Sequence, residues 1–183
     1  MFYCFLTTGF EEIEAITTVD MLRRAGIDMK TVAVTEDNTL AVTGSHNITI
    51  TADMHITDAS SDVCVGVFLP GGMPGTTNLD ESAQVRELIS CCAENDKYIF
   101  AICAAPSVLG HMGLLSGKAA TCYPGFEPEL TGAQLSSEPA VQDGKIITGK
   151  GPGATIAFAS LIITELKGSA VCADLKSAMQ CSE

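Results

Sequence analysis

Short runs of apolar residues alternate along the chain with longer stretches in which apolar side chains recur at helical spacing. The runs at 2–6, 63–69 and 98–102 are continuously apolar, so they predict strands that are buried on both faces of a sheet. Residues 11–25 instead place apolar side chains one helical turn apart and stop at Gly26, which favours a helix that ends there. Strands separated by helices of about 10–15 residues are typical of a mostly parallel sheet with helices on both faces.

The remaining segments fit the same α/β architecture. A further strand is predicted at 29–34, hairpins at 39–51 and 140–148, and helices at 81–94, 104–112, 154–166 and 170–179. No linker-like stretch, low-complexity segment or internal repeat divides the sequence. We therefore expect a single domain over residues 1–183.

Composition and charge narrow the range of functions. Of the 183 residues 46% are hydrophobic, which is enough for a sizeable core, and 22 Asp and Glu oppose 10 Lys and Arg, for a formal net charge of −12. A surface this acidic repels phosphate backbones and anionic lipids, so nucleic-acid and membrane partners are not expected. No apolar run approaches the roughly 20 residues that a membrane-spanning helix needs.

The amino-terminal segment and the cysteines favour a cytoplasmic location. No basic residue precedes the apolar run at 2–6, so we interpret it as a strand rather than a signal peptide. The eight cysteines lack C-x-x-C spacing, so we expect reduced thiols and neither a disulfide scaffold nor a structural zinc site. The sequence predicts no metal and no other cofactor.

Three loops follow predicted strands at the edge where ligands bind in such sheets, namely 7–14, 70–78 and 103–107. In the third loop, Cys103 lies between a buried strand and a helix and has alanines around it, as a nucleophile on a sharp strand-to-helix turn would. The helix N-terminus would lower the pKa of the Cys103 thiol. The alternative is that Cys103 is a small buried hydrophobic residue, as many free cysteines are.

The other two loops offer groups that complement a nucleophile. The glycines of loop 70–78 permit close backbone approach and N–H groups directed into the crevice, as in an oxyanion hole, or they form a plain turn. Glu11, Glu12 and Glu14 complement the N-terminus of the first predicted helix. Glu14 lies one turn inside that helix, from where it can project toward the strand ends.

Five motifs, in this order along the chain, resemble those of the ThiJ/PfpI superfamily. They are Gly-Phe-Glu-Glu-Ile-Glu-Ala at 9–15, Asp-Met-Leu-Arg-Arg-Ala-Gly at 20–26, Leu-Pro-Gly-Gly-Met-Pro-Gly at 69–75, Ala-Ile-Cys-Ala-Ala-Pro at 101–106 and Gly-Pro-Gly-Ala-Thr at 151–155. The sequence is most similar to the parkinsonism-associated deglycase branch, which includes the bacterial YajL-type chaperones. The resemblance spans residues 2 to about 179.

This resemblance implies a flavodoxin-like, three-layer α/β sandwich of the class I glutamine amidotransferase-like type, usually homodimeric, with one reactive cysteine. By motif position that cysteine is Cys103, and the glutamate that hydrogen-bonds to it is Glu14. The oxyanion-type backbone donors match Gly72 and Ala104. The activities implied are cofactor-independent glyoxalase, protein deglycase, redox sensing and chaperone activity.

One position departs from the pattern of many relatives, which carry a histidine before a proline beyond the helix that follows the reactive cysteine. Here Tyr123 precedes Pro124, and we expect Tyr123 to contribute to substrate binding instead. Its neighbour Cys122 is a second thiol candidate that would line the same pocket, or else a buried structural cysteine.

The three histidines do not replace the missing one. His111 lies about 12 Å along a helix from Cys103, too far for direct proton transfer, and we interpret His46 and His55 as surface or packing residues. A Cys-His-Glu triad for peptide hydrolysis is therefore not expected.

The dyad of Cys103 and Glu14 supports two hypotheses, because a buried thiol and carboxyl in contact favour one shared negative charge. In the first, the protein is an enzyme acting on glyoxal, methylglyoxal or early protein glycation adducts, with Cys103 adding to the aldehyde and Glu14 moving protons. In the second, it is a redox sensor or redox-regulated chaperone of oxidative stress that uses the oxidisable Cys103. A third reading is a hydrolase completed by a histidine of a dimer partner.

Overall fold

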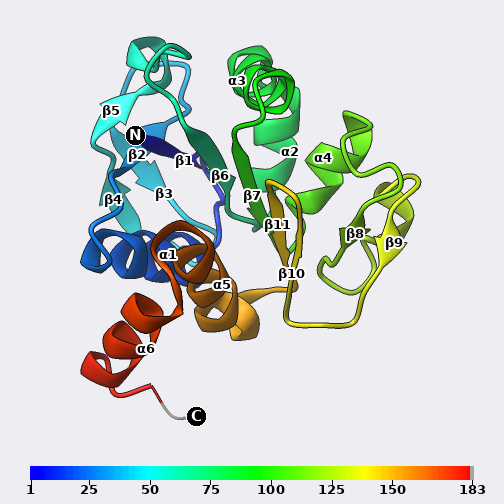
Figure 1. The fold of residues 1–183 in the computed structure, drawn as a ribbon. Helices are drawn as coiled ribbons and strands as arrows, with labels where there is room; N and C mark the ends of the chain where they lie inside the picture. Colours follow the sequence, from blue (N-terminus) through cyan, green and yellow to red (C-terminus); the bar gives the residue numbers. More distant parts are fainter. Residues whose placement is uncertain (182–183) are drawn as a thin grey trace.

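A central sheet of seven strands has the order β10-β11-β7-β6-β1-β2-β5 in the computed structural model, which describes residues 1–181 (Figure 1). Every neighbouring pair is parallel except β10 and β11, which form an antiparallel hairpin at one edge. The strands are β1 Phe2–Leu6, β2 Met29–Ala33, β5 Met54–His55, β6 Gly66–Leu69, β7 Tyr98–Ile102, β10 Ala140–Asp143 and β11 Ile146–Gly149.

Helices cover both faces of this sheet, and Figure 1 shows α1, α5 and α6 on one face and α2, α3 and α4 on the other. They are α1 Glu12–Arg24, α2 Gly75–Glu81, α3 Ala83–Glu94, α4 Pro106–His111, α5 Thr155–Lys167 and α6 Ser169–Ala178, with 3₁₀ turns η1 Ile56–Asp58, η2 Glu127–Glu129 and η3 Pro152–Ala154. Two small sheets complete the fold, the hairpin of β3 Ala41–Thr43 with β4 Thr49–Thr51 and the pair of β8 Ala119–Ala120 with β9 Gln134–Leu135.

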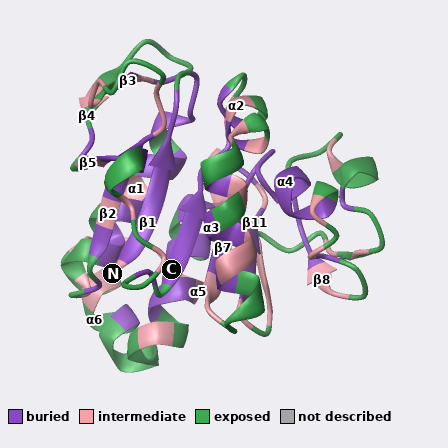
Figure 2. Cartoon of the chain, turned by 90° about the horizontal axis from the view of Figure 1, so that it is seen from above, coloured by how far each residue is buried: buried purple, intermediate pink, exposed green. Residues whose placement is uncertain are grey.

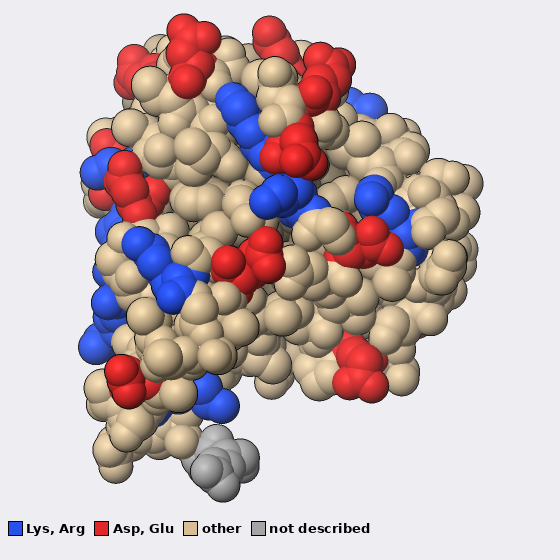
Figure 3. Space-filling view, in the orientation of Figure 1, with Lys and Arg blue, Asp and Glu red and all other residues tan. Residues whose placement is uncertain are grey.

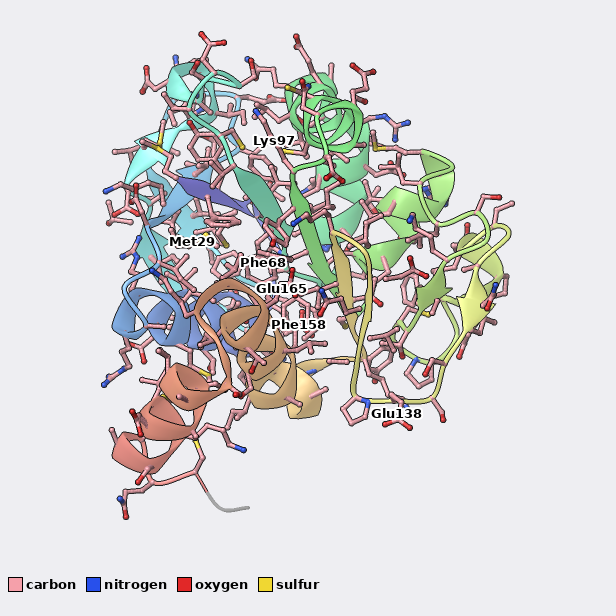
Figure 4. All side chains as sticks on the ribbon, in the orientation of Figure 1. Met29, Phe68, Lys97, Glu138, Phe158 and Glu165 are labelled. Atoms are coloured by element: carbon pink, nitrogen blue, oxygen red, sulfur yellow. The ribbon has the colours of Figure 1, made fainter. Side chains whose placement is uncertain are left out.

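The core consists of two apolar layers, one on each face of the sheet. Phe2 and Leu6 of β1 belong to the layer under α1 and α5, whereas Phe5 between them belongs to the layer under α3 and α4. In the first layer, Phe68 of β6 packs against Phe158 of α5 with ring centroids 5.7 Å apart (Figure 4). Because strand side chains alternate between faces, a strand that packs on both sides must be apolar throughout, which explains the continuous runs.

The flavodoxin-like α/β architecture expected from the sequence is confirmed, and the innermost strands β1 and β6 are buried from end to end (Figure 2). The differences are local. Helix α2 was not expected, because 75–81 has little apolar periodicity and follows a Gly/Pro-rich segment; loop 70–78 is therefore shorter than expected. The strand predicted at 63–69 begins only at Gly66, and the short strands β5, β8 and β9 carry too few residues to give a pattern.

The order of the strands fixes where the site lies. The chain runs from β1 outward to β2 on one side and from β6 outward to β7 on the other, so the topology switches between β1 and β6. A crevice opens at such a switch point, outside the carboxyl ends of the strands. The segments that leave these ends are those that begin at Thr7, Pro70 and Cys103.

On the face seen in Figure 3, lysines and arginines are interspersed with aspartates and glutamates. None of the helices within residues 1–181 is long and apolar enough to cross a membrane.

Candidate active site

Cys103 is the residue at which β7 turns toward α4, and its backbone is held in a conformation that L-residues rarely adopt. Its φ is +66°, in the left-handed region. The Cys103 N–H donates to the carbonyl of Gly149 at 2.9 Å, and its own carbonyl accepts from the Tyr123 N–H at 2.8 Å. These two bonds hold the strained residue in place, as expected of a nucleophile on a strand-to-helix turn.

Glu14 reaches the same point from the first turn of α1. The side chain of Glu11 caps this helix by accepting the N–H of Glu14 at 2.8 Å, which orients the start of the helix toward the strand ends. The Glu14 side chain is completely buried, at 0% exposure, and its Oε2 accepts the N–H of Gly71 at 2.8 Å. Its other oxygen, Oε1, is buried with no regular hydrogen-bond partner among the described residues.

Gly71 brings the dyad together because it has no side chain. A Cβ atom at this position would lie 2.6 Å from Cβ of Cys103 and 2.8 Å from Oε2 of Glu14. Only a glycine lets the backbone pass between the two functional side chains and donate its N–H to the carboxyl group. The three loops expected to converge therefore meet at one point.

Burial controls the protonation of the pair. It raises the pKa of the Glu14 carboxyl to about 7, although hydrogen bonds with Cys103 and Gly71 lower it. Burial also raises the pKa of the Cys103 thiol, and the neighbouring Glu14 carboxylate raises it further. The prediction that Cys103 has a lowered pKa at the helix N-terminus is therefore wrong, because desolvation and the neighbouring Glu14 carboxylate raise this pKa. The two groups share at most one negative charge at neutral pH.

Two backbone N–H groups oppose the effect of burial on the pKa of the Cys103 thiol. Hydrogen bonds from Ala104 and Gly72 to the sulfur lower the pKa of Cys103. Gly72 has φ +91°, and a Cβ there would lie 2.5 Å from the backbone nitrogen of Glu11, so its orientation also requires glycine. The role of these two backbone N–H groups as oxyanion donors stays a prediction.

Tyr123 and Cys122 lie beside the dyad rather than within it. Tyr123 contacts Cys103 through its backbone, while the residue as a whole is 46% exposed and lines a pocket of about 350 Å³ with Pro124 and Gly151. Cys122 is buried, and burial raises the pKa of its thiol to about 11. Within residues 1–181, no hydrogen bond joins its sulfur to that of Cys103.

Comparison with known proteins assigns the family. Residues 2–165 match the model of the DJ-1/PfpI family. The chain belongs to the DJ-1/PfpI family. Drosophila melanogaster dj-1beta is 38% identical over 165 residues, which cover 89% of this chain and 87% of that protein. The crystal structure of Drosophila DJ-1beta superposes with a TM-score of 0.93 at 34% identity, over 100% of this chain and 98% of that one.

Two further DJ-1 relatives bear on the branch and on function. The Parkinson disease protein 7 homolog of Danio rerio is 35% identical over 175 residues, 94% of this chain and 92% of the relative. The glutathione-independent glyoxalase DJR-1.2 of Caenorhabditis elegans is 31% identical over 160 residues, 86% of this chain and 83% of the relative. The resemblance to a DJ-1-like branch is thus confirmed, and that branch contains a glyoxalase.

In this member of the DJ-1/PfpI family the histidines make other contacts. His111 bridges α2 and η2, with Nδ1 2.6 Å from Asp80 and Nε2 2.9 Å from Glu129. His55 is buried, with Nε2 2.9 Å from the carbonyl of Thr35. His46 contacts Glu12 through Nδ1 at 3.0 Å.

Within residues 1–181, ligand atoms that are close enough together to hold a metal ion come from Glu11, Glu12 and His46. The carboxylate oxygens of this group already accept hydrogen bonds from the protein. Oε1 of Glu12 accepts the N–H groups of His46 and Ile48 at 2.7 and 3.3 Å, and Glu11 caps α1. These contacts account for the group as a clamp between α1 and the β3–β4 hairpin.

Sequence reasoning missed Gly71 as a site residue. The family motif pointed to Gly72, but the N–H that binds the Glu14 carboxyl is that of Gly71. The signal was present as two adjacent glycines directly after a buried strand, yet only the structure distinguishes the two roles.

Proposed function

We propose that this protein is a cofactor-independent glyoxalase that converts glyoxal and methylglyoxal into hydroxy acids, with Cys103 as nucleophile and Glu14 as proton carrier. The observation that carries the proposal is the completely buried carboxyl group of Glu14 beside Cys103, with its pKa raised to about 7. A group with this pKa takes up and gives back protons at neutral pH. The activity of the nematode relative supports the same chemistry.

The reaction follows from the two roles. Because Glu14 loses its proton before Cys103 does, its carboxylate takes the proton of the Cys103 thiol as the sulfur adds to the aldehyde carbon. The protonated carboxyl group then passes this proton to the new alkoxide oxygen, which completes a hemithioacetal. Glu14 removes the hydrogen of that carbon as a proton, which gives an enediol in which the hydroxyl proton of the hemithioacetal moves to the oxygen of the adjacent carbonyl. Glu14 then returns its proton to the adjacent carbon, and the first carbon becomes the carbonyl of a thioester. Water then cleaves the thioester, releasing lactate from methylglyoxal or glycolate from glyoxal and restoring the thiol.

The backbone donors at the sulfur suit the first step. The N–H groups of Gly72 and Ala104 stabilise negative charge on Cys103 in the free protein. When the sulfur bonds to carbon, its charge passes to the aldehyde oxygen, and these donors are the nearest groups able to follow it. We therefore propose that these two N–H groups act as oxyanion donors and that Tyr123 contributes to substrate binding.

The site favours small aldehydes over adducts on folded proteins. Cys103 is only 8% exposed, so a side-chain adduct on a folded partner has little access to the sulfur. We therefore expect activity on glyoxal and methylglyoxal to exceed the release of early glycation adducts from protein. Glycation adducts on short unfolded peptides are the matched comparison for adducts on folded proteins, because they carry the same reactive group without the steric bulk of a folded partner.

The test is lactate formation from methylglyoxal without glutathione. The wild type should be active, and Cys103→Ala should abolish turnover. Glu14→Gln, which keeps the acceptor for the Gly71 N–H but cannot carry a proton, should lower kcat at least 100-fold, at the lower end of the roughly 10²–10⁴-fold effect of general acid–base catalysis. Cys122→Ser is the control and should stay within about two-fold of the wild type, since its sulfur does not contact Cys103. Equal activity of wild type and Glu14→Gln would refute the assigned role of Glu14.

A second function, peroxide sensing by Cys103, rests on the surroundings of the Glu14 carboxyl group. Among the described residues its buried Oε1 has no nitrogen or oxygen partner and only the weakly bonding thiol of Cys103 nearby, and a sulfinic acid on Cys103 would supply a stronger hydrogen bond with the carboxyl group. Sensing predicts that hydrogen peroxide, at two or more equivalents per chain, adds two oxygens to Cys103 and none to the other cysteines. Glu14→Gln should weaken that selectivity. If the lactate assay shows no activity while this oxidation occurs, sensing becomes the supported function.

We also propose that the protein is a homodimer. Ile13 and Ile16 on α1 and Ile48 on the β3–β4 hairpin are exposed, and the hydrogen bond from the Ile48 N–H to Glu12 keeps the hairpin beside the helix. An apolar surface of this kind is typical of contact with a second copy. Light scattering should give twice the chain mass, and Ile16→Glu should reduce it to one.

A further inference from the structure

Two buried thiols meet on the opposite face of the sheet from α1. Cys64 lies just before β6 and Cys92 lies near the end of α3, and their sulfur atoms are 3.8 Å apart. Both are free thiols, with exposures of 2% and 1%. The sulfurs are in van der Waals contact, and rotation of the two side chains must bring them roughly 1.8 Å closer to reach the S–S length of about 2.0 Å.

Lys97 ties together the two segments that carry these thiols. Its backbone N–H donates to the carbonyl of Cys92 at 2.8 Å. Its ammonium group donates to the carbonyl of Ser61 at 3.0 Å, in the loop that leads into Cys64. Figure 4 shows Lys97 between this loop and α3. A fixed positive charge therefore accompanies the thiol pair.

We propose that Cys64 and Cys92 form a second redox site, separate from Cys103, in which hydrogen peroxide joins the two sulfurs as an intramolecular disulfide. The site lies outside the crevice of the proposed glyoxalase and does not depend on that activity. Hydrogen peroxide is the oxidant proposed because the two sulfurs are almost completely enclosed, so that an oxidant must be about as small as water to reach them when the surrounding side chains move.

The two thiols have different roles in the reaction. The hydrogen bond with Cys92 lowers the pKa of the Cys64 thiol, and the charge of Lys97 lowers it as well, whereas burial opposes them. The same hydrogen bond and burial raise the pKa of Cys92. The Cys64 thiol donates its hydrogen to the carbonyl of Gly66 at 3.4 Å, so Cys92 is the donor and Cys64 the acceptor in the contact between the two sulfurs. We therefore assign Cys64 as the thiol that attacks first and Cys92 as the resolving thiol.

The reaction balances in two steps. The Cys64 thiolate attacks one oxygen of hydrogen peroxide, the O–O bond breaks, and the departing hydroxide takes up a proton to become water, which leaves a sulfenic acid. The sulfur of Cys92 then attacks the Cys64 sulfur, the S–O bond breaks, and the hydroxide leaves with the Cys92 proton as a second water. Two thiols lose two electrons in total, and one peroxide is reduced to two waters.

The test uses the full-length Cys103→Ala protein, so that peroxide is not consumed at the active site. After treatment with equimolar hydrogen peroxide, the remaining thiols are alkylated and the protein is digested without reduction. Mass spectrometry should find the peptides containing Cys64 and Cys92 joined, with the loss of two hydrogens. A linkage from Cys64 to the adjacent, half-buried Cys91, or complete alkylation of both Cys64 and Cys92, would overturn the proposal.

Three variants in the same background test the assigned roles. Cys92→Ser should stop the reaction at a sulfenic acid on Cys64 that dimedone traps, and Lys97→Met should slow linkage at pH 7 several-fold. Cys172→Ser, which removes another buried thiol, is the control and should leave linkage unchanged. Oxidised glutathione should not modify the pair in the folded protein. A glutathione adduct on either sulfur, or linkage at the same rate in Lys97→Met, would contradict the assigned roles.

Discussion

The burial of Glu14 predicts that Glu14→Gln makes the protein more stable, and increasingly so as the pH rises. The pKa of this carboxyl is about 7 in the folded protein against 4.5 as its ordinary value. Between these values the folded state holds a proton that the unfolded state has lost, so stability falls as the pH rises through this window and reaches its low level above about 7. Below about 4.5 both states are protonated and no such cost arises.

The magnitude follows from the two pKa values. Proton linkage gives a destabilisation by Glu14 of about 1 kcal/mol at pH 5 and about 3 kcal/mol at pH 8. Glutamine has the same shape, remains neutral, and keeps the acceptor for the Gly71 N–H. The stability advantage of Glu14→Gln over the wild type should thus be about 2 kcal/mol larger at pH 8 than at pH 5. For a chain of this size that corresponds to roughly 4–8 °C in Tm.

Urea unfolding at both pH values measures this difference directly. Glu12→Gln is the matched control, because hydrogen bonds with His46 and backbone N–H groups overcome burial and lower the pKa of Glu12. That variant should lose stability at both pH values, since Glu12 is ionised in the folded and unfolded states alike. If Glu14→Gln is equally affected at pH 5 and pH 8, or is less stable than the wild type at pH 8, the buried carboxyl does not have the raised pKa on which the proposed chemistry rests.

Three further predictions concern packing and charge. Gly71→Ala should abolish lactate formation and cost about 1–3 kcal/mol, since its Cβ would lie 2.6 Å from that of Cys103, whereas Gly153→Ala meets nothing within 4 Å and should leave Tm unchanged. Contacts with Glu129 and Asp80 raise the pKa of His111, so His111→Gln should lower Tm at pH 5.5 and have little effect at pH 9, by less than about 1 kcal/mol because the side chain is partly exposed. Asp53→Asn should lower the free energy of unfolding at pH 7 by about 1 kcal/mol, since Asp53 accepts the N–H and hydroxyl of a β2 threonine; unchanged urea midpoints would contradict this.

Much of the fold could be predicted because local pattern and tertiary role coincide. The strands β1 and β7 lie at the predicted residues, and α1 ends one residue before the expected position. Helix α2 escaped prediction because its Gly-Thr-Thr-Asn start has neither apolar periodicity nor a capping side chain. The position of Cys103 at a strand–helix junction could be predicted from the local sequence, because an apolar run stops there and Pro106 follows.

The amino-acid sequence by itself determined the order of buried strands and helices, the family, and the short list of groups able to do chemistry. It could not determine their protonation, because the pKa of Glu14 depends on how completely the sheet and α1 exclude water from it. Nor could it pair Cys64 with Cys92, which are 28 positions apart and meet only because α3 packs against β6. Residues close in the chain interact through local geometry that a pattern reveals, whereas desolvation and long-range contact exist only once the layers have packed.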